Sequence, residues 1–206
     1  MLTIVDYGVG NLASIRNMLK KVGVNALISS DEKAIRDADK LILPGVGAFD
    51  TCAAKLQQSG LTDTINKKVL EEKIPLLGVC VGMQLLTEGS EEGELPGLGW
   101  IGGRVVKFRQ DRMPAGTKIP HMGWTDVKQT KSSPLLEGMY DEPRFYFVHS
   151  YYTELKDPGD ALVTAQYGYP FVAGLEFQNI IGVQFHPEKS HKFGMKLLSN
   201  FVNNYK

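Results

Sequence analysis

The sequence predicts an α/β fold: a three-layer sandwich in which helices flank a central, mostly parallel sheet, with a smaller mixed or antiparallel sheet beside it. Two observations carry this expectation. In the first half of the chain, short apolar or β-branched runs alternate with longer segments of helical periodicity, which is the pattern of βαβ units. After about residue 95 the chain changes to glycine-rich turns and short alternating strands, which is typical of antiparallel pairing.

The first half supplies the parallel layer and the helices that cover it. Leu12, Ile15, Leu19 and Val22 recur at helical spacing. The strand that ends at Val79 is preceded by a continuous apolar run, which indicates burial on both faces of the sheet. Strands are expected at residues 2–6, 24–28 and 41–43 and up to residue 79, and helices at residues 12–22, 48–58 and 61–72.

The second half supplies the antiparallel strands, one more buried strand and a closing helix. The segment 110–117, polar and with Pro114 and Gly116, is the best candidate for a mobile loop. No internal repeat or low-complexity linker occurs, so residues 1–206 are expected to form a single domain. Strands are expected at residues 103–108, 124–127, 144–152, 161–167 and 180–185, and a helix at 190–203.

Composition excludes several classes of function. Lys plus Arg and Asp plus Glu both number 23, so the formal net charge is zero, and nucleic-acid or anionic membrane partners are not expected. The chain has only two cysteines, Cys52 and Cys80, and no His/Cys cluster at metal spacing. We therefore expect no disulfide framework, no bound metal and no cofactor. Residues 1–6 lack a basic signal region, and no apolar run approaches the ~20 residues of a membrane span. We therefore expect a soluble cytoplasmic protein.

Cys80 is the leading candidate nucleophile. The run GVCVG at residues 78–82 joins an apolar strand to a helix-compatible stretch at 83–87, and glycines two before and two after Cys80 suit a strained turn that exposes the central side chain. The positive end of the following helix would favour a thiolate. The alternative is a small buried cysteine beside a glycine-rich turn, since free cysteines are often buried.

His186 and Glu188 are the candidate partners of Cys80. They follow the late strand 180–185, and reacting groups gather where parallel strands end. His186 can take the thiol proton while Glu188 orients the imidazole, which makes a Cys/His/Glu triad. In the alternative interpretation His186 caps the strand and Glu188 caps the final helix. His121 and His149 are rival bases without a carboxylate two or three residues on, and His191 is expected to be solvated.

Two further motifs point to the same site. PGVG at residues 44–47 follows a strand, and its glycines let backbone N–H groups approach a developing negative charge as an oxyanion hole, although such turns are common. Gln84 lies one helical turn after Cys80, where its amide either binds a polar substrate or is a buried structural group.

Taken together, these motifs resemble the triad-type, or class I, glutamine amidotransferases, over nearly the whole chain. The shared motifs are GVCVGMQ at 78–84, PGVG at 44–47 and HPE at 186–188. Within that family the chain is similar to the HisH group, the glutaminase subunits of imidazole glycerol phosphate synthase. Four further stretches carry this resemblance: DYGVGNL at 6–12, SEEG at 90–93, HMGW at 121–124 and YFVHSYY at 146–152.

The resemblance implies a flavodoxin-like fold and a mechanism in which Cys80 is the nucleophile, His186 the base and then acid, and Glu188 its orienting carboxylate. It further implies that Val46, Gly47 and Val81 supply the oxyanion hole, and that glutamine binds near Gln84, Ser150 and Tyr151. Ammonia would pass to a separate (β/α)₈-barrel cyclase subunit in a heterodimer. The positions at or near that interface would be Tyr7, Asn11, Trp124, Tyr146, His149 and Lys189, for which ordinary turn and core roles are the alternative.

Other functions stay open at the level of sequence. One rival is the amidase subunit of another synthase, such as anthranilate synthase, although the stretches at 7–11 and 121–124 argue against it. A glutamine-binding regulatory module would be expected to lack a member of the triad. A thiol protease or redox protein is a third class, since an activated cysteine serves several acyl transfers. At position 125 this chain has Thr, where the family more often carries Asn after Gly-Trp. This difference puts a partner contact at Thr125 in doubt rather than the chemistry.

Overall fold

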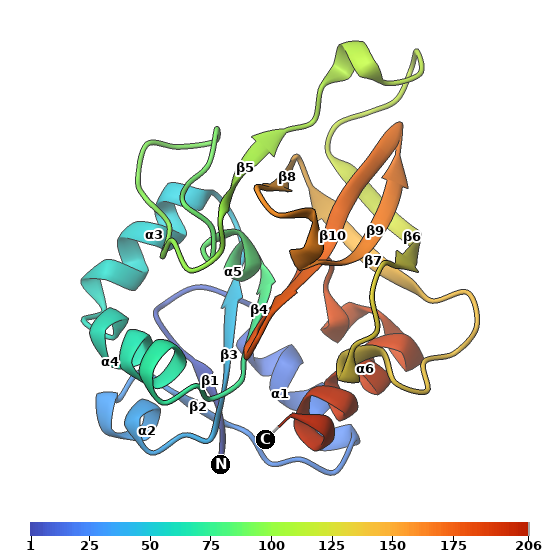
Figure 1. Ribbon diagram of the computed structural model, residues 1–206. Coiled ribbons are helices and arrows are strands. Elements are labelled where there is room, and N and C mark those ends of the chain that lie inside the picture. The colour runs from blue at the N-terminus through green and yellow to red at the C-terminus, as the bar shows by residue number, and fades with distance from the viewer. Residues whose placement is uncertain (206) are drawn as a thin grey trace.

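Parallel strands form one half of the sheet in the computed structural model, which describes residues 1–205 (Figure 1). The parallel pairs join β2 to β1, β1 to β3, β3 to β4 and β4 to β11. All residues of β1, β4 and β11 are buried, as expected for strands covered on both faces. These strands are β1 (Leu2–Val5), β2 (Leu27–Ser29), β3 (Lys40–Gly45), β4 (Leu76–Cys80) and β11 (Ile180–Val183).

Antiparallel strands continue the same sheet beyond β11. The order runs β11, β10, β9, β6, β7, while β8 pairs with β10 and with β5. The smaller sheet expected from the sequence is therefore not separate, because β10 pairs directly with β11 through Gly174 to Phe177. The strands are β5 (Gly103–Lys107), β6 (His121–Gln129), β7 (Arg144–His149), β8 (Tyr151–Leu155), β9 (Ala161–Tyr167) and β10 (Tyr169–Phe177).

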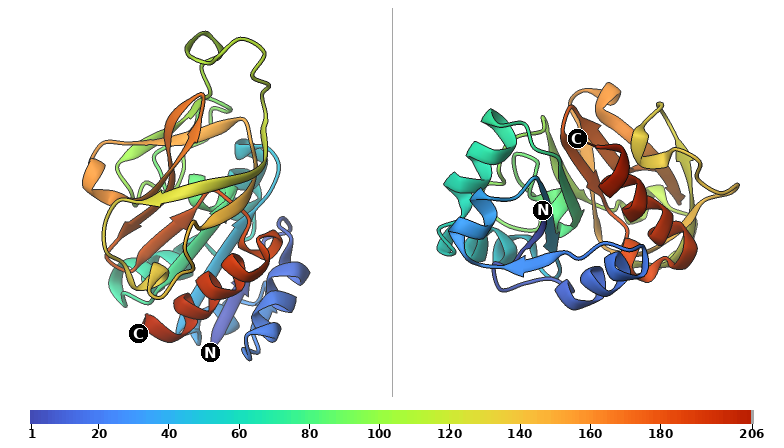
Figure 2. Two further views of the ribbon diagram at one scale, coloured as in Figure 1. Left: turned by 90° about the vertical axis from the view of Figure 1, so that its right-hand side faces the viewer. Right: turned by 90° about the horizontal axis from the view of Figure 1, so that it is seen from below.

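Helices cover both faces of the parallel strands. Figures 1 and 2 show α1 and α6 together on one side and α3 and α4 on the other. The helices are α1 (Leu12–Lys21), α2 (Glu32–Arg36), α3 (Phe49–Gln58), α4 (Thr62–Asn66), continued by a π-helical turn Lys67–Glu71, α5 (Val81–Gln84) and α6 (His191–Asn204). Short 3-10 turns lie at Gln110–Arg112, Pro134–Leu136, Pro158–Asp160 and Pro187–Lys189.

Most expected elements are present, and the differences have local causes. The helix α2 is too short to show a periodic apolar face and buries only Ile35. The strand β10 contains Pro170 and Gly174, which mark strand ends or bulges in a sequence, and its register does shift at Gly174. The strand expected over residues 144–152 is two strands, because the chain turns at Ser150.

The helix after Cys80 is shorter than the sequence pattern allows. The sequence pattern is compatible with a helix to Thr87, but α5 ends at Gln84. The Thr87 hydroxyl donates to the Gln84 carbonyl at 2.8 Å, while the Thr87 N–H bonds the same oxygen at 3.1 Å. A threonine that bonds a nearby carbonyl competes with the helical pattern, so the chain leaves the helix after one turn.

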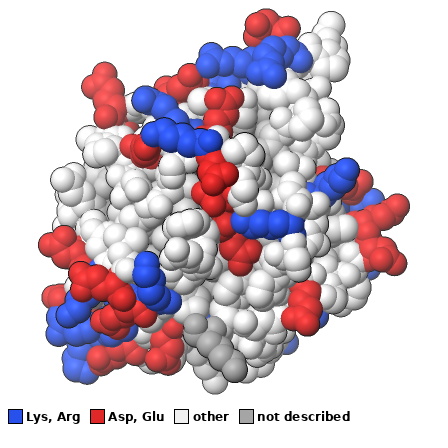
Figure 3. Space-filling view, viewed as in Figure 1, with Lys and Arg blue, Asp and Glu red and all other residues white. Residues whose placement is uncertain are grey.

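The surface offers no patch of one sign on the face seen in Figure 3, where acidic and basic side chains are interspersed. Within residues 1–205, no helix combines the length and apolar character needed to cross a bilayer.

Glycines let β3 approach the turn that follows β4. Gly45 is the register partner of Cys80. A Cβ added at Gly82 would lie 1.9 Å from the Leu43 carbonyl oxygen, and one at Gly78 would lie 2.8 Å from the Gly82 carbonyl oxygen. Both contacts are with backbone atoms, which cannot swing away, so this turn tolerates no side chain at either position.

Gly82→Ala is expected to destabilise the fold by about 1–3 kcal/mol or more, because the added methyl overlaps the β3 backbone. Urea unfolding measures the change. Gly102→Ala is the matched control, since a Cβ there meets only the flexible Lys156 side chain at 3.5 Å. Equal stability losses in the two variants would contradict the close contact between β3 and the turn.

Candidate active site

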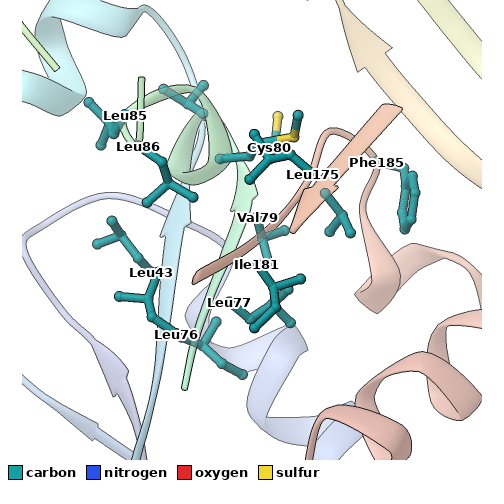
Figure 4. Close-up of a cluster of buried hydrophobic side chains, with 14 of the residues drawn as sticks. Leu43, Leu76, Leu77, Val79, Cys80, Leu85, Leu86, Leu175, Ile181 and Phe185 are labelled. Atoms are coloured by element: carbon teal, nitrogen blue, oxygen red, sulfur yellow. The ribbon is translucent and has the colours of Figure 1, made fainter. Parts of the chain in front are cut away.

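Cys80 occupies a strained turn at the end of β4. Its φ of 57° and ψ of −114° lie where residues other than glycine rarely occur. This is the nucleophile elbow that the flanking glycines predict. The side chain caps a cluster of buried aliphatic residues, among them Leu77, Val79 and Ile181 (Figure 4). The residue is only 5% exposed, and it lines a cavity rather than the outer surface.

His186 lies between Cys80 and Glu188. Its Nδ1 is 2.8 Å from Glu188 Oε1, and the imidazole lies close enough to Cys80 for the two charges to interact. Because Nδ1 is engaged by the carboxylate, Nε2 is the nitrogen that faces the sulfur. The alternative interpretation of Glu188 as a helix cap is not what the structure shows, since Ser190 occupies the cap position of α6 and Glu188 turns inward.

The surroundings favour the charged form of His186. Burial opposes the charge, but hydrogen bonds donated to Cys80 and Glu188, and the negative charges of those two groups, outweigh it and raise the pKa of His186 to about 10. The Glu188 side chain is 1% exposed, and its Oε2 has no hydrogen-bond partner within residues 1–205. A buried carboxylate of this kind is stable only beside a cation, so Glu188 and a protonated His186 support each other.

A cavity of about 360 Å³ opens above the Cys80 sulfur, a size that suits a small metabolite. Most candidates from the sequence line it: Val46, Gly47, Val81, Gln84, His149, Ser150, Tyr151, His186 and Lys189. Sequence reasoning missed three lining residues, Glu92, Pro120 and Val148. Glu92 and Val148 stand in two of the stretches that resemble the HisH group, which was the available signal.

Buried side chains hold the loop that contains Val46 and Gly47. The Tyr7 hydroxyl donates to the Pro44 carbonyl at 2.6 Å, and the Cys52 thiol donates to the Val46 carbonyl at 3.4 Å. Gly47 has a φ of 95°, which a glycine adopts without strain. Since N–H and C=O point in opposite directions across a trans peptide, the Gly47 N–H points away from the Cys52 thiol.

Glu92 belongs to a loop that is tied to the start of α3. Its Oε2 accepts the Phe49 N–H at 2.9 Å. Asp50 accepts the N–H groups of Glu94 and Leu95, both at 3.0 Å. These bonds bring the Glu92 carboxylate to the wall of the cavity. Glu92 lies in a loop outside the periodic strands and helices, so hydrophobic periodicity could not predict this position.

His149 and His121 are not bases for Cys80. His149 Nδ1 lies 2.7 Å from the Tyr151 carbonyl, so this nitrogen carries the proton and donates. His121 Nδ1 then donates to His149 Nε2 at 2.9 Å, and the Thr125 hydroxyl donates to His121 Nε2 at 2.8 Å. Each ring therefore has one donor and one acceptor nitrogen. Burial lowers the pKa of His121 to about 4 and that of His149 to about 3, so both rings are neutral at pH 7.

The residues expected at a partner interface divide into two groups. Trp124 is 44% exposed, and its ring lies 6.4 Å from that of Tyr146 and 5.4 Å from that of His191. The Lys189 ammonium lies 5.7 Å from the centre of the Tyr146 ring and also lines the cavity. These side chains therefore connect the cavity with the surface, and His191 is exposed as expected.

The other expected interface residues are placed differently. Tyr7 and His149 are buried, and they support the loop at 44–47 and the Tyr151 carbonyl. Their position at or near a partner interface stays a prediction. Asn11 precedes α1 at the cap position, but its side chain makes no capping hydrogen bond. No group of three metal-ligating side chains lies within residues 1–205.

Comparison with known proteins agrees with this site. The glutamine amidotransferase class-I family matches residues 3–205. The chain is 52% identical over 202 residues to imidazole glycerol phosphate synthase subunit HisH 2 of Methanococcus maripaludis, with 98% of each chain covered. It is 51% identical over 204 residues to subunit HisH 2 of Pseudomonas aeruginosa, again with 98% of each covered. The chain is a class I glutamine amidotransferase of the HisH group.

Solved structures share the fold. The chain is similar to PurLQS from Thermotoga maritima, with a TM-score of 0.74 and 18% identity over 98% of this chain and 97% of that one. It is also similar to a glutamine amidotransferase with a TM-score of 0.71 and 21% identity, over 97% and 96% of the two chains. The family, the fold and the glutaminase function expected from the motifs are thereby confirmed.

The neutral histidine pair predicts a pH dependence of stability. Both pKa values lie below the ordinary 6.5, so the unfolded chain binds more protons between pH 6.5 and about 4. The contribution of this pair to the free energy of unfolding is expected to be complete above pH 6.5 and to be lost as the pH drops through this window. NMR titration of the imidazoles should show both rings neutral at pH 5.

His121→Phe is the matched variant, because its ring keeps the stacking on Phe147 and Tyr167 but cannot titrate. Its stability should depend less on pH between 6.5 and 4 than that of the wild type. An ordinary titration near pH 6.5 for either histidine of the wild type would contradict the neutral chain.

Proposed function

We propose that this chain hydrolyses glutamine at Cys80, through a cysteine thioester, and delivers the ammonia to a cyclase subunit of imidazole glycerol phosphate synthase. The observation that carries this proposal is the placement of His186 between the Cys80 sulfur and the Glu188 carboxylate, at the floor of a cavity sized for an amino acid. The sheet runs unbroken from β2 to β7, which supports one glutamine amidotransferase domain over residues 1–206.

In the first half-reaction Cys80 is the nucleophile. Its sulfur attacks the carboxamide carbon, a C–S bond forms, and the carbonyl electron pair moves onto oxygen. The N–H groups of the loop at Val46 and Gly47, together with that of Val81, would stabilise this oxyanion. As the tetrahedral adduct collapses, the C–N bond breaks and the nitrogen takes the proton held by His186, which releases ammonia and leaves a thioester.

In the second half-reaction His186, now neutral, takes a proton from water as the water oxygen attacks the thioester carbon. The C–S bond breaks, glutamate leaves, and the sulfur is regenerated beside a protonated His186. Glu188 keeps the ring oriented through both steps by holding Nδ1. No cofactor takes part in either step.

The polar groups of the cavity suit the α-amino acid end of glutamine. The Glu92 carboxylate would pair with the substrate ammonium, and backbone groups at Ser150 and Tyr151 would bind the same end of the molecule. The Gln84 side-chain N–H₂ group already donates to Gln184 and to the Tyr151 carbonyl. The Gln84 Oε1 atom is therefore the one that could accept a hydrogen bond from a ligand in the cavity.

A heterodimer with a (β/α)₈-barrel cyclase fits the surface beside the cavity. The relatives from Methanococcus maripaludis and Pseudomonas aeruginosa are named as subunits of a synthase. Next to the cavity, Met122 and Trp124 are 61% and 44% exposed, which is unusual for large apolar side chains and typical of a protein contact. We place the pair in the cytoplasm, because a catalytic thiol beside a second free cysteine, Cys52, suits a reducing compartment.

Reconstitution with a cyclase subunit tests this function. Mixed with the cyclase and its nucleotide substrate, the chain should support imidazole glycerol phosphate formation from glutamine. Cys80→Ala should lose glutamine-dependent formation while an added ammonium salt restores it, because only the ammonia source is removed. Glutamate production by Cys80→Ala, or no glutamine-dependent product with the wild type, would contradict the proposal.

Glu188→Gln is expected to lower glutamine turnover by about a hundredfold or more, because a neutral amide no longer supports the charged imidazole. Steady-state glutamate release measures turnover, and thermal unfolding checks the fold. A variant with altered stability but near-normal turnover would show that Glu188 is structural only.

Glu92→Gln is expected to raise the KM for glutamine by about tenfold, with a smaller effect on kcat, because it removes the charge opposite the substrate ammonium. Its amide oxygen can still accept the Phe49 N–H, so the loop is retained. Glu91→Gln is the control, since Glu91 bonds Lys107 and Arg109 outside the cavity. Equal KM values for both variants would remove Glu92 from the substrate site.

A further inference from the structure

Gln184 is a fully buried amide that contacts the nucleophile. It follows β11, two residues before His186, and its backbone N–H donates to the Ala173 carbonyl at 2.9 Å. Its side-chain Nε2 lies 3.8 Å from the Cys80 sulfur, and its Oε1 accepts Gln84 Nε2 at 3.0 Å. Nothing in the steps above uses this amide.

The direction of the chain of hydrogen bonds follows from its far end. The Tyr151 carbonyl is an acceptor only, so the Gln84 atom 3.4 Å from it must be the nitrogen. The same nitrogen then donates to Gln184, which must present its oxygen to Gln84. The other end of the Gln184 amide, the N–H₂ group, is thereby turned toward the Cys80 sulfur.

A buried N–H₂ group in this position distinguishes the two states of the sulfur. An N–H is a poor partner for a neutral thiol and a good one for an anion, because hydrogen bonds to charged groups are roughly twice as strong. The donor sits at 0% exposure, where water cannot replace the sulfur as its partner. It therefore favours the anionic nucleophile.

We propose that Gln184 is a further catalytic residue, which donates its amide N–H to the Cys80 sulfur and stabilises the sulfur as an anion, with Gln84 and the Tyr151 carbonyl setting its orientation. This inference rests on the proposed role of Cys80 as the nucleophile. The same hydrogen bonds connect β8, which is expected to bind the substrate, with the Cys80 sulfur. The Tyr151 carbonyl of β8 orients the Gln84 amide, and the Gln84 amide orients that of Gln184.

Few titratable groups face the Cys80 sulfur. His186 lies close enough for its charge to interact with that of Cys80, with Glu188 behind the ring. Tyr7 and Cys52 lie close enough for their charges to interact with that of Cys80, and burial raises the pKa of both. Glu92 and Lys189 stand farther along the cavity wall. Substitution of Gln184 leaves all of these groups in place.

The test measures the reactivity of Cys80 without glutamine. Iodoacetamide is applied from pH 5 to 10, and mass spectrometry quantifies modification of the peptide that contains Cys80. In Gln184→Met, which keeps the length of the side chain but has no donor, the midpoint of the pH profile should move up by about one unit. At pH values below the wild-type midpoint, modification should then be about tenfold slower. Gln184→Leu is the second variant if the methionine disturbs folding.

Gln84→Met should move the midpoint in the same direction by a smaller amount, because it loosens the orientation of Gln184 but leaves the donor. Gln166→Met, at an exposed position near the end of β9 where the amide bonds only the Gly168 carbonyl among the described residues, is the matched control and should keep the wild-type profile. A wild-type profile in folded Gln184→Met or Gln184→Leu overturns the inference. Because no glutamine is used, this outcome is distinct from a failure of the glutaminase proposal.

Discussion

The contact between β3 and the turn that follows β4 is the constraint on which the site depends. The absence of side chains at Gly78 and Gly82 lets the turn pack on the β3 backbone, where Gly82 comes against the Leu43 carbonyl. This packing holds Cys80 at a positive φ that the residue would otherwise avoid. The same approach brings the loop at Gly47 to the wall of the cavity in which the sulfur lies.

The local environment then divides the histidines into two kinds. His186 has a buried carboxylate on one side and the sulfur on the other, so it is favoured as a cation despite its burial. His121 and His149 hydrogen-bond only neutral groups, namely each other, a hydroxyl and a carbonyl, and burial keeps them uncharged. Histidine therefore has two roles in this protein: His186 belongs to the candidate catalytic group, and His149 holds the strand end at Tyr151. Neighbouring groups from other parts of the chain determine which histidine is charged.

The parts of the site that are local in the chain could be predicted from sequence. The glycines around Cys80 and the spacing of His186 and Glu188 lie within a few residues, so elementary sterics and hydrogen bonding indicate their roles. Residues that meet only through strand register could not be predicted in this way. Gln184 reaches Cys80 because β11 pairs with β4, with Val183 opposite Val79, and His121 meets His149 because β6 and β7 place them opposite each other.

Trapping of the covalent intermediate tests the central claim most directly. The wild-type chain, assembled with the cyclase, is mixed with glutamine, quenched in acid within the turnover time, digested and examined by mass spectrometry. A glutamyl thioester should appear on the peptide that contains Cys80 and should be absent when Cys80→Ser is treated in the same way. Glutamate release without any adduct, or an adduct on Cys52 instead, would contradict the assignment of Cys80 as the nucleophile.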